Sequence, residues 1–537
     1  MRSKYLGFFF VFSIVLLIVF PFLKNPYLFD DSILFLTDGV GLPAVGRDPL
    51  APRWWIYKSF VWYLQRDGQL LWLRLGNILL HFAVVIAFFS FARQLIVDAL
   101  SIPRERASLA VFLSSVLLTV HPLAIYTQSY LVQRTVICAA LFAMLSLFLF
   151  WQGLNGRRWG LWGALLCFVL SIYSKEHVVM LPVVSLALLV LYVRSGMQIK
   201  IGKVELFAAL ALQFLVSLWV VLSFKWLLAS SYEIGAGEVM AGELEVSASL
   251  LYPVSVLNQA LLFFKYLGLW ILPNPLWVAI DMRENFPATV TDPRLWLGGA
   301  LFVAYCLTGL TLLWRGRLKG LVGLGLLMPA LLFFTEFSTV RLQEMFVIYR
   351  SYLWVPSLFL VLAAGLTRMQ VRPSVILIAI VSIVYLGLAY DRLTVMSSPV
   401  LAWNEAKELM ERSEARPSAL GAYRIYYNLG SALGERGLKE EAMKNYDQAL
   451  ARKPGYVLAR LNRGIILLER KEWQRAYTDF DVAVQSMPNF IKPYIGRARA
   501  LQGMGRAAEA QVDLERACNM GAKNICQELN TGEAGND

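Results

Sequence analysis

Long runs of apolar residues recur along the first 390 positions of the chain, and they constrain its fold more than any other feature. A segment that crosses the roughly 30 Å of hydrocarbon in a bilayer needs about 20 apolar residues and must satisfy its backbone hydrogen bonds internally, which favours helices. Eleven runs meet this requirement, at about 5–23, 70–92, 107–125, 134–152, 159–174, 178–194, 205–229, 295–314, 320–335, 351–367 and 374–390. The sequence therefore predicts an all-α, polytopic membrane protein.

The amino-acid composition agrees with a membrane location and excludes an ordinary water-soluble enzyme. Hydrophobic residues make up 58% of the chain and charged residues only 16%, whereas soluble domains carry roughly 25% charged residues. The formal net charge of +13 would also suit a nucleic-acid-binding protein. Because cationic loops at the cytoplasmic face of a membrane explain the same excess, we expect membrane lipid, and no nucleic acid, as a partner.

Short basic loops between alternate runs indicate the orientation of the chain. With the N-terminus in the cytoplasm, every loop that falls inside is cationic, and these loops carry Arg93/Arg104/Arg106, Arg157/Arg158, Arg194/Lys200/Lys203, Arg315/Arg317/Lys319 and Arg368/Arg372. The opposite orientation would export all of them, against the positive-inside bias. An odd number of spans then places the C-terminal region on the non-cytoplasmic side.

One further apolar segment, 251–272, is long enough to span the membrane but does not fit this scheme. A crossing there would invert the orientation of everything after it and export the loop that contains Arg315 and Arg317. We therefore expect an interfacial or re-entrant helix on the outer side, with the Lys265 ammonium group reaching water.

The C-terminal residues repeat with a period of 34. This spacing aligns Gly430 with Gly464 and Ala498, Ala442 with Ala476 and Ala510, Tyr446 with Phe480 and Leu514, Ala449 with Ala483 and Ala517, and Pro454 with Pro488. Such a pattern is typical of tetratricopeptide repeats, in which small residues let two helices cross closely and a bulky residue packs between them. Stacked repeats of this kind either act as a helical spacer or form a concave surface that binds a partner, and we favour the second interpretation.

These observations predict three regions: a transmembrane domain at 1–392 with its first outer loop at 24–69, a linker at 393–422, and a tetratricopeptide-repeat domain at 423–537. Cys518 and Cys526 lie close together in the last region. If the repeats are exported, these two residues form either a disulfide or a buried thiol pair.

Ionisable residues near the outer ends of the apolar runs are the candidate functional residues, because charge at membrane depth is costly and often marks a functional site. Under the orientation above they share one face of the membrane, and they are Asp30, Asp31, His121, Arg134, Lys175, Glu176, His177, Glu344 and Arg350. Paired carboxylates beside cations suit chemistry in which a phosphate leaves. A carboxylate then acts as a base or metal ligand for an acceptor hydroxyl, while Arg or Lys neutralises charge on the phosphate.

Each of these residues also has a purely structural interpretation. Asp30 and Asp31 suit the N-cap of a helix that begins at Ser32. Arg134 and Arg350 suit interfacial anchors. His81, inside the second run, suits a hydrogen bond between helices better than a ligand. No phosphate-binding loop, dinucleotide fingerprint, nucleophile elbow or zinc-protease motif occurs in the sequence.

Five stretches of the chain, taken in order, resemble the C-type glycosyltransferase (GT-C) superfamily. They are FDDSILF, LGNILLHFAVVIAFFSFARQL, VHPLAIYTQSYLVQRTVICAALFAMLSLFLFW, SIYSKEHVVMLPVVSLALL and QEMFVIYRSYLWVPSLF. Together with the trailing repeats, they are most similar to the transmembrane and tetratricopeptide-repeat-containing O-mannosyltransferases and their bacterial relatives.

The resemblance implies an inverting transferase that moves a sugar from a polyprenyl-phosphate or polyprenyl-diphosphate donor to an exported acceptor protein, such as pilin. It places the protein in the bacterial inner membrane with its repeats in the periplasm. Asp30 and Asp31 match the catalytic base of the first outer loop, or a ligand for a divalent cation such as Mg²⁺ or Mn²⁺ in one branch of the superfamily. Arg134, Lys175 and Arg350 match donor-phosphate contacts, whereas the roles of His121, Glu176 and Glu344 stay open.

Two other classes of function compete with a transferase. A non-catalytic membrane-anchored scaffold for envelope or pilus assembly would use only the repeats. A transporter is less favoured, because transport sites belong near the bilayer midplane, whereas the ionisable residues here lie toward one face.

Overall fold

The computed structural model describes residues 2–26, 49–64, 69–223, 248–287, 290–341, 345–412 and 420–531, and these residues are helical with no β-strand among them. They form two compact units. The membrane unit comprises Met1–Val278 and Phe286–Ser398, and the repeat unit comprises Ala279–Asn285 and Pro399–Asp537. Asp30, Asp31 and Glu344 lie outside the described residues.

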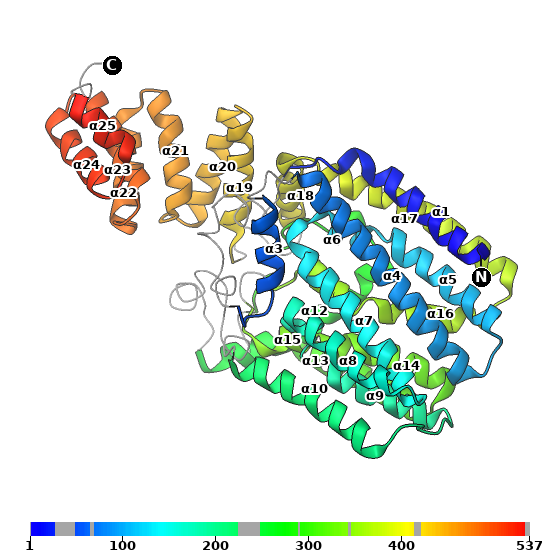
Figure 1. Ribbon diagram of the computed structural model, residues 1–537. Helices are drawn as coiled ribbons and strands as arrows, with labels where there is room; N and C mark the ends of the chain where they lie inside the picture. The colour runs from blue at the N-terminus through cyan, green and yellow to red at the C-terminus, as the bar shows by residue number, and fades with distance from the viewer. Residues whose placement is uncertain are drawn as a thin grey trace. The chain divides into compact units, whose positions relative to one another are not determined.

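The membrane unit is a bundle of helices (Figure 1). Its α-helices are α1 (Arg2–Val19), α3 (Trp54–Leu64), α4 (Leu70–Leu100), α5 (Arg104–Val120), α6 (Pro122–Ser129), α7 (Arg134–Leu154), α8 (Arg158–Ser174), α9 (Leu181–Arg194), α10 (Lys203–Ser223), α12 (Ala248–Ile271), α13 (Pro293–Trp314), α14 (Arg317–Leu332), α15 (Phe334–Ser338), α16 (Pro356–Leu366) and α17 (Val371–Val395). Short 3-10 helices occur at η1 (Phe20–Phe22), η3 (Leu131–Gln133), η4 (Glu176–Val178), η6 (Pro275–Trp277) and η7 (Ile348–Leu353).

Eight helices among the described residues are long and apolar enough to cross a membrane, or nine if the bent pair α5 and α6 is one span. That pair bends by 52° at His121, next to Pro122, because proline cannot continue the backbone hydrogen bonds of the preceding helix. Three more apolar helices, at 7–22, 158–174 and 356–366, are shorter. The structure is therefore compatible with a membrane protein, but the predicted count of eleven spans is not confirmed.

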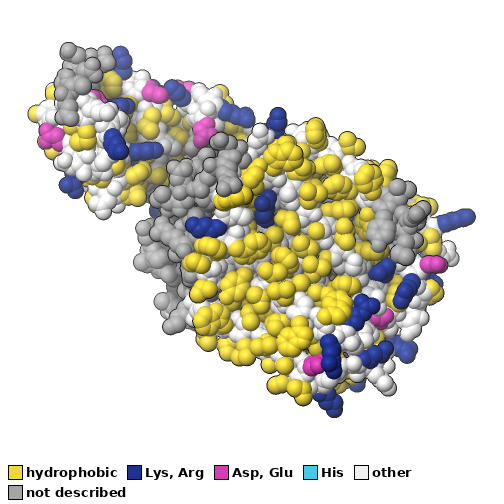
Figure 2. Space-filling view, viewed as in Figure 1, with side chains coloured by type: hydrophobic (Ala, Val, Ile, Leu, Met, Phe, Trp, Pro, Cys, Tyr) yellow, Lys and Arg dark blue, Asp and Glu magenta, His cyan; other side chains and the backbone are white. Residues whose placement is uncertain are grey.

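The outer helices of this bundle expose apolar faces. Only 17% of the apolar stretch of α13 and 22% of that of α17 is buried, against 72% for the span that contains α7. Hydrophobic side chains cover most of the membrane unit's face shown in Figure 2, and Lys and Arg side chains gather along one edge of that unit. Exposed tryptophans lie near helix ends, at Trp72, Trp159, Trp296 and Trp314, where an indole ring suits the boundary between lipid and water.

Three of the basic loops lie together at one end of the bundle, here called the basic end. Arg194 donates to the Trp314 carbonyl (2.7 Å), the Lys200 amide to the Leu154 carbonyl (3.0 Å), and the Arg317 amide to the Ser195 hydroxyl (2.9 Å). The loops after α7, α9 and α13 are therefore neighbours, as the positive-inside argument requires.

Helix α12 corresponds to the ambiguous segment 251–272 and is continuous despite Pro253. Along its length, α12 forms hydrogen bonds to residues between 341 and 351. Ser255 bonds to the Arg341 amide and Gln259 to the Met345 carbonyl. Tyr266 bonds to the Val347 amide and Trp270 to the Ser351 hydroxyl. Helix α12 is one of the eight helices that are long and apolar enough to cross a membrane, so the expectation of an interfacial or re-entrant segment that does not span is not confirmed.

The repeat unit contains α18 (Pro399–Arg412) and then α19 (Ala422–Glu435), α20 (Lys439–Arg452), α21 (Val457–Glu469), α22 (Trp473–Ser486), α23 (Ile491–Gly503), α24 (Ala507–Asn519) and α25 (Lys523–Thr531). A Cβ atom on Gly430 would lie 2.8 Å from the Tyr446 ring, and one on Gly464 would lie 2.8 Å from the Phe480 ring. The small residues therefore permit the close helix crossings that the 34-residue spacing predicts, and the tetratricopeptide-like helix pairs are confirmed.

Two arginines, also 34 residues apart, join successive helix pairs. Arg463 bonds to Asp479 of its own pair and to Asp447 of the preceding pair. Arg497 bonds in the same way to Asp513 and Asp481. Hydrogen bonding to Asp479 raises the pKa of the Arg463 guanidinium above its usual value. The repeat therefore includes an ion-pair ladder that the apolar alignment did not reveal.

Replacing Asp479 by alanine should destabilise the repeat unit by about 2–3 kcal/mol, because this carboxylate is 2% exposed and also bonds to Arg460. Asp447→Ala is the matched control, since its carboxylate is 47% exposed and its loss should cost less than about 1 kcal/mol. Hydrogen exchange of peptides from α21 and α22 in the full chain measures both effects. Equal protection in the two variants would contradict this ranking.

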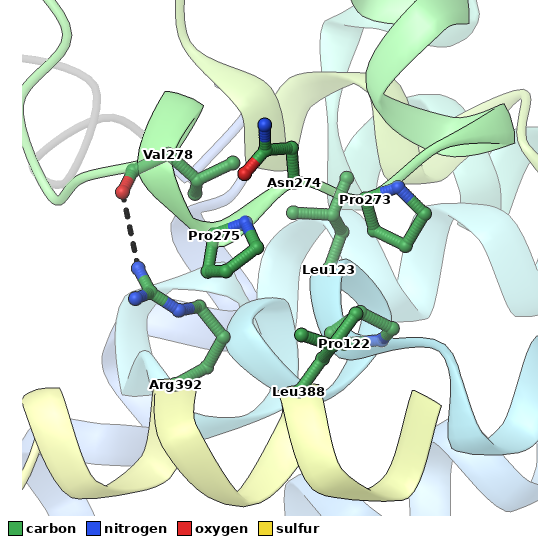
Figure 3. Close-up of a pocket in the computed structure, with 8 residues that line it drawn as sticks. All are labelled: Pro122, Leu123, Pro273, Asn274, Pro275, Val278, Leu388 and Arg392. Atoms are coloured by element: carbon green, nitrogen blue, oxygen red, sulfur yellow. Dashed lines mark hydrogen bonds between the residues drawn. The ribbon is translucent and has the colours of Figure 1, made fainter. Parts of the chain in front are cut away.

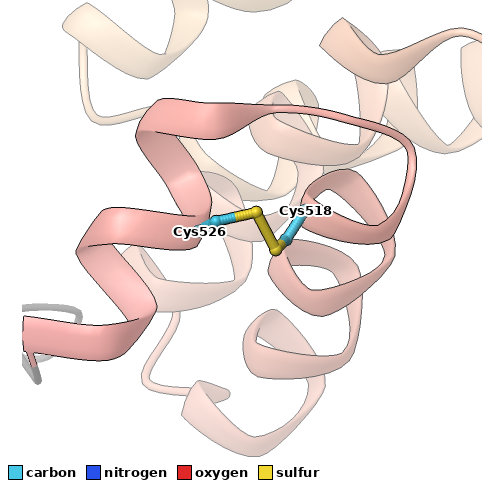
Figure 4. Close-up of a disulfide and its surroundings, with 2 residues drawn as sticks. All are labelled: Cys518 and Cys526. Atoms are coloured by element: carbon cyan, nitrogen blue, oxygen red, sulfur yellow. A yellow bond between two sulfur atoms is a disulfide. The ribbon is translucent and has the colours of Figure 1, made fainter.

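Cys518 and Cys526 form a disulfide that joins α24 to α25 (Figure 4). The structure thus selects the disulfide from the two predicted alternatives. The cross-link holds the last helix against the repeats, where Ile525 packs into the same core as Leu514 and Ala517.

The seven-residue segment Ala279–Asn285 also belongs to the repeat unit, although it lies between α12 and α13 in the chain. Arg283 is buried, pairs with Asp281 and donates to the Leu420 carbonyl (3.5 Å). Removal of the C-terminal residues alone would therefore separate this buried segment from its packing partners.

Candidate functional site

A cluster of charged residues, all buried except the partly buried Arg53, lies in the membrane unit at the end of the helices away from the basic end. Three parts of the chain contribute to it: the residue before α3 (Arg53), the connection between α8 and α9 (Lys175, Glu176 and His177), and the region from α15 to η7 (Glu336, Arg341 and Arg350). These contacts bring together residues that lie more than 100 positions apart in the sequence.

Arg53 and Glu176 form the first ion pair of the cluster. The Arg53 Nε atom donates to Glu176 Oε2 at 2.8 Å, and its Nη2 atom contacts Oε1. The Arg53 backbone has a φ of 72° and its amide donates to the Tyr173 carbonyl at the end of α8. Because a non-glycine residue rarely adopts this conformation, the contacts of Arg53 must hold it there.

Glu336 forms the second group of ion pairs. Its Oε2 atom lies 3.3 Å from Arg341 Nε and 3.2 Å from Arg350 Nη1, and all three side chains are buried. His177 lies between the two groups, with Nδ1 3.2 Å from Glu176 Oε1 and Nε2 3.3 Å from Glu336 Oε1. These contacts connect Arg53 to Arg350, although neither ring nitrogen of His177 has hydrogen-bond geometry toward a carboxylate.

Lys175 adds a further cation beside this chain. It lies between α8 and η4 and is 7% exposed. Burial, together with the charges of Arg53, Arg350 and Arg341, lowers the pKa of Lys175 to about 7. The neighbouring Glu176 carboxylate opposes this shift only in part.

The cluster therefore contains four cations (Arg53, Lys175, Arg341 and Arg350) and two carboxylates (Glu176 and Glu336), a formal excess of two positive charges without counting His177. Unbalanced charge of one sign is costly where water is excluded. A multivalent anion such as a phosphate would balance it, through the bidentate contacts that arginine offers and the point charge of lysine.

The structure brings together four of the candidate residues, Lys175, Glu176, His177 and Arg350. Asp30, Asp31 and Glu344 lie outside the described residues. The other two contact different partners. Arg134 donates to the Asn77 side chain (2.7 Å) and to the Leu73 carbonyl (2.6 Å), and it lies over the Phe60 ring.

His121 also lies away from the charged cluster. Its Nδ1 atom accepts from the Leu123 amide at the start of α6, its Nε2 atom donates to the Trp270 carbonyl (3.1 Å), and its ring stacks on that indole. His81 contacts the Tyr352 hydroxyl (2.5 Å) and the Thr119 carbonyl (3.4 Å), which is the interhelical role expected from the sequence. In the described structure, both histidines join packed elements.

Sequence reasoning missed Arg53, Glu336 and Arg341, and it assigned no role to His177. The only local signal was the density of ionisable residues near the ends of apolar runs, at Lys175–His177 and at Glu336–Arg350. No periodic pattern in the sequence indicates that Arg53 pairs with Glu176.

A metal site and a ligand pocket have less support than the charged cluster. Among the described residues, no group of three or more His, Cys, Asp or Glu side chains is arranged to hold a metal ion. A small pocket between α6, η6 and α17 is lined mainly by Pro122, Leu123, Pro273, Pro275 and Leu388, and Arg392 donates to the Val278 carbonyl beside it (3.0 Å; Figure 3). Its empty space of about 180 Å³ is partly open to solvent and its lining is mainly apolar, so we assign it no ligand.

The fold and the cluster define a helical protein with apolar helices suited to a membrane, a buried cationic site and a unit of tetratricopeptide-like repeats. No protein-family model matches the chain. Among solved structures, it is similar to a MamA double mutant, with 21% identity over 24% of this chain and 70% of that one and a TM-score of 0.22. It is similar to MamA itself with 22% identity over 28% of this chain and 76% of that one and a TM-score of 0.20. It is also similar to YrrB, a tetratricopeptide-repeat protein with an unusual peptide-binding site, with 16% identity over 30% of this chain and 89% of that one and a TM-score of 0.21. The repeats are assigned here from their own helix pairs and spacing.

The lowered pKa of Lys175 predicts that any phosphate binding at this site depends on pH. Because a bound phosphate favours the charged ammonium, binding would take up a proton when the free site is partly neutral. Affinity for a phosphate ligand should therefore fall as pH rises above about 7, by up to roughly tenfold per unit. Lys175→Arg, which stays charged throughout, should flatten this dependence, and titrations of both proteins across this range measure it. Identical pH profiles would contradict the role of Lys175.

Proposed function

We propose that this protein is a membrane glycosyltransferase of the C type. It takes a sugar from a polyprenyl-phosphate or polyprenyl-diphosphate donor and transfers it, with inversion, to a hydroxyl of an exported protein such as pilin. The observation that carries the proposal is the buried cationic cluster, in which Lys175 and Arg350 lie with Arg53 and Arg341. Phosphate is a leaving group that such a cluster stabilises.

In the proposed reaction, Asp30 or Asp31 removes the proton of the acceptor hydroxyl. The resulting oxygen attacks the anomeric carbon as the bond between that carbon and the phosphate oxygen breaks. The electron pair of the broken bond goes to the phosphate, whose added negative charge is balanced by the cluster. Interactions that strengthen as this charge develops accelerate the chemical step, because they favour the transition state over the bound donor.

Two observations support a periplasmic location for the site and the repeats. The basic loops after α7, α9 and α13 lie together at the other end of the membrane unit, which suits the cytoplasmic face of the inner membrane. The disulfide between Cys518 and Cys526 suits an oxidising compartment.

The repeat unit is proposed to present the acceptor protein. In the first helices of the three pairs, positions 34 residues apart form rows: Arg424, Leu458 and Lys492 in one, and Ser431, Ile465 and Arg499 in the other. Leu458 and Ile465 are 37% and 46% exposed, although both are apolar. Stacked repeats characteristically bind partners on a concave surface, and these two rows are proposed to belong to it.

Intact-mass measurement of exported surface proteins tests the proposal directly. Cells that lack this protein should lose a mass increment of one sugar from at least one exported protein, and the wild-type chain should restore it. The size of the increment would identify the sugar and its acceptor together. Unchanged masses across the exported proteins would contradict a transferase that acts on protein.

A membrane-anchored scaffold for envelope or pilus assembly is the second candidate, and the exposed Leu458 and Ile465 side chains favour it. A scaffold function does not explain the buried charges of the membrane unit. Point substitutions separate the two functions better than deletion of the repeats, because Ala279–Asn285 packs within the repeat unit. A scaffold would tolerate Lys175→Gln, whereas a transferase would lose activity.

A further inference from the structure

Three loops at the basic end of the membrane unit form one continuous surface. The Lys200 amide donates to the carbonyl of the last residue of α7 (3.0 Å), which joins the loop after α9 to the loop after α7. The Arg317 amide donates to the Ser195 hydroxyl (2.9 Å), which joins the loop after α13 to the end of α9. Gly316 has a φ of 65°, and a side chain there would collide with the Arg194 carbonyl. The charged side chains of these loops are therefore held near one another.

Cations dominate this surface. The three loops carry eight exposed Lys or Arg side chains, and the one carboxylate beside them in the sequence, Glu205, pairs with Arg158 at 3.4 Å. Asp98, at the end of α4, accepts instead from the Trp151 indole and the Gln94 amide. Within the part of the chain that the structure describes, the other seven cations have no carboxylate partner. They are Arg157, Arg194, Lys200, Lys203, Arg315, Arg317 and Lys319. Uncompensated charge of one sign attracts anions to such a surface.

Arg194 is held in position by Trp314. Its Nε atom donates to the Trp314 carbonyl at 2.7 Å, and its guanidinium lies 4.3 Å from the centre of the indole ring. Its side chain is exposed, and its two Nη atoms donate to no group among the described residues. Because the indole already fixes the guanidinium plane, these N–H groups can contact an external anion with little loss of conformational entropy.

Two exposed tryptophans place these cations at the edge of the hydrocarbon. Trp314 is the last residue of α13, and only 17% of the apolar stretch of that helix is buried. Arg157 lies over the ring of exposed Trp159, at 6.0 Å. Indole rings prefer the boundary between hydrocarbon and headgroups, which is also where the phosphate of a phospholipid lies. A nucleic acid or a soluble protein would match the charge but would not explain tryptophans at the end of an apolar helix.

We propose that the basic end binds the phosphate groups of anionic phospholipids. Arg194 is the fixed contact, and the side chains of Arg315, Arg317 and Lys319 from the loop after α13 add charge around it. Arginine matches phosphate through paired N–H donors, and clustered cations beside membrane helices favour lipids with a net negative charge. This surface is a second phosphate site, at the opposite end of the membrane unit from the buried cluster, and it does not rest on the proposed sugar transfer.

Native mass spectrometry of the full-length protein in detergent tests the proposal, with phosphatidylglycerol or phosphatidylcholine of the same acyl chains as the added lipid. The wild-type protein should bind phosphatidylglycerol more tightly. The loop variant Arg315→Gln/Lys319→Gln removes two side chains that form no hydrogen bond or ion pair in the described structure, so it should keep the fold. Its affinity for phosphatidylglycerol should fall by about tenfold or more, because each basic residue near an anionic lipid contributes a factor of roughly five. Adding Arg194→Gln should lower it further, and binding of phosphatidylcholine should change little.

Arg475→Gln/Arg506→Gln is the matched control, because it removes the same charge from exposed side chains of the repeat unit. It should keep the preference for phosphatidylglycerol. The proposal would be overturned by equal binding of the two lipids to the wild-type protein, by an unchanged preference in the loop variant, or by an equal loss in the control. Displacement of phosphatidylglycerol by a double-stranded DNA oligonucleotide would assign the surface to nucleic acid instead.

Discussion

Sugar transfer should fall by about 10²–10⁴-fold when Asp30 and Asp31 are both replaced by asparagine, because removal of a general base typically has an effect of this size. Asparagine keeps the size and the helix-capping ability of aspartate but does not accept the proton of the acceptor hydroxyl. The capping interpretation of this pair therefore predicts little change, and the catalytic one predicts near-complete loss. The rate of release of polyprenyl phosphate from a sugar donor distinguishes them.

The matched control for this experiment is Asp292→Asn. Asp292 caps α13 and pairs with the exposed Arg294, and asparagine preserves the cap. It should leave transfer near the wild-type rate. Single variants of Asp30 and Asp31 would identify which carboxylate acts as the base, and full activity in the double variant would remove both from the mechanism.

The largest expected effect on stability follows from Glu336→Gln. This carboxylate lies within 3.3 Å of His177, Arg341 and Arg350, and these three partners are buried with it. Loss of its charge leaves buried cations without compensation, which typically costs about 3–5 kcal/mol. The variant should unfold at a lower temperature in detergent and should also bind polyprenyl phosphate less tightly.

Glu205→Gln provides the comparison for this experiment. Glu205 pairs with Arg158 at 3.4 Å near the basic end, where the arginine side chain is 79% exposed, so its loss should cost less than about 1 kcal/mol. Thermal unfolding of the two variants measures the difference. Equal midpoints would show that the buried cluster contributes no more to stability than a surface pair.

The sequence carries enough information for those parts of the fold that depend on local spacing. The 34-residue alignment of Gly430 with Gly464, and of Tyr446 with Phe480, predicted the helix crossings seen in the repeat unit. Hydropathy located most of the long helices for the same reason, since a helix satisfies its backbone hydrogen bonds within one segment of the chain. It did not predict the bend at His121, although Pro122 is a local signal for one, and it did not predict the course of α12, which depends on packing against distant residues.

The candidate site was predicted only in part, for the same physical reason. Lys175 and Arg350 were recognised because charge is conspicuous beside an apolar run. Arg53 and Glu336 were missed because they acquire their roles from partners more than 100 residues away, Arg53 through Glu176 and Glu336 through His177. Pairings over such distances leave no periodic signal in a single sequence.

Binding of polyprenyl phosphate to the purified full-length protein, compared with polyprenol of the same length, tests the central claim most directly. We expect the phosphate to bind much more tightly than the alcohol, and the variant Lys175→Gln/Arg350→Gln to lose this preference. Arg194→Gln, at the basic end, should retain it. Equal binding of the two lipids by the wild-type protein, or an unchanged preference in the double variant, would contradict a phosphate site in the buried cluster.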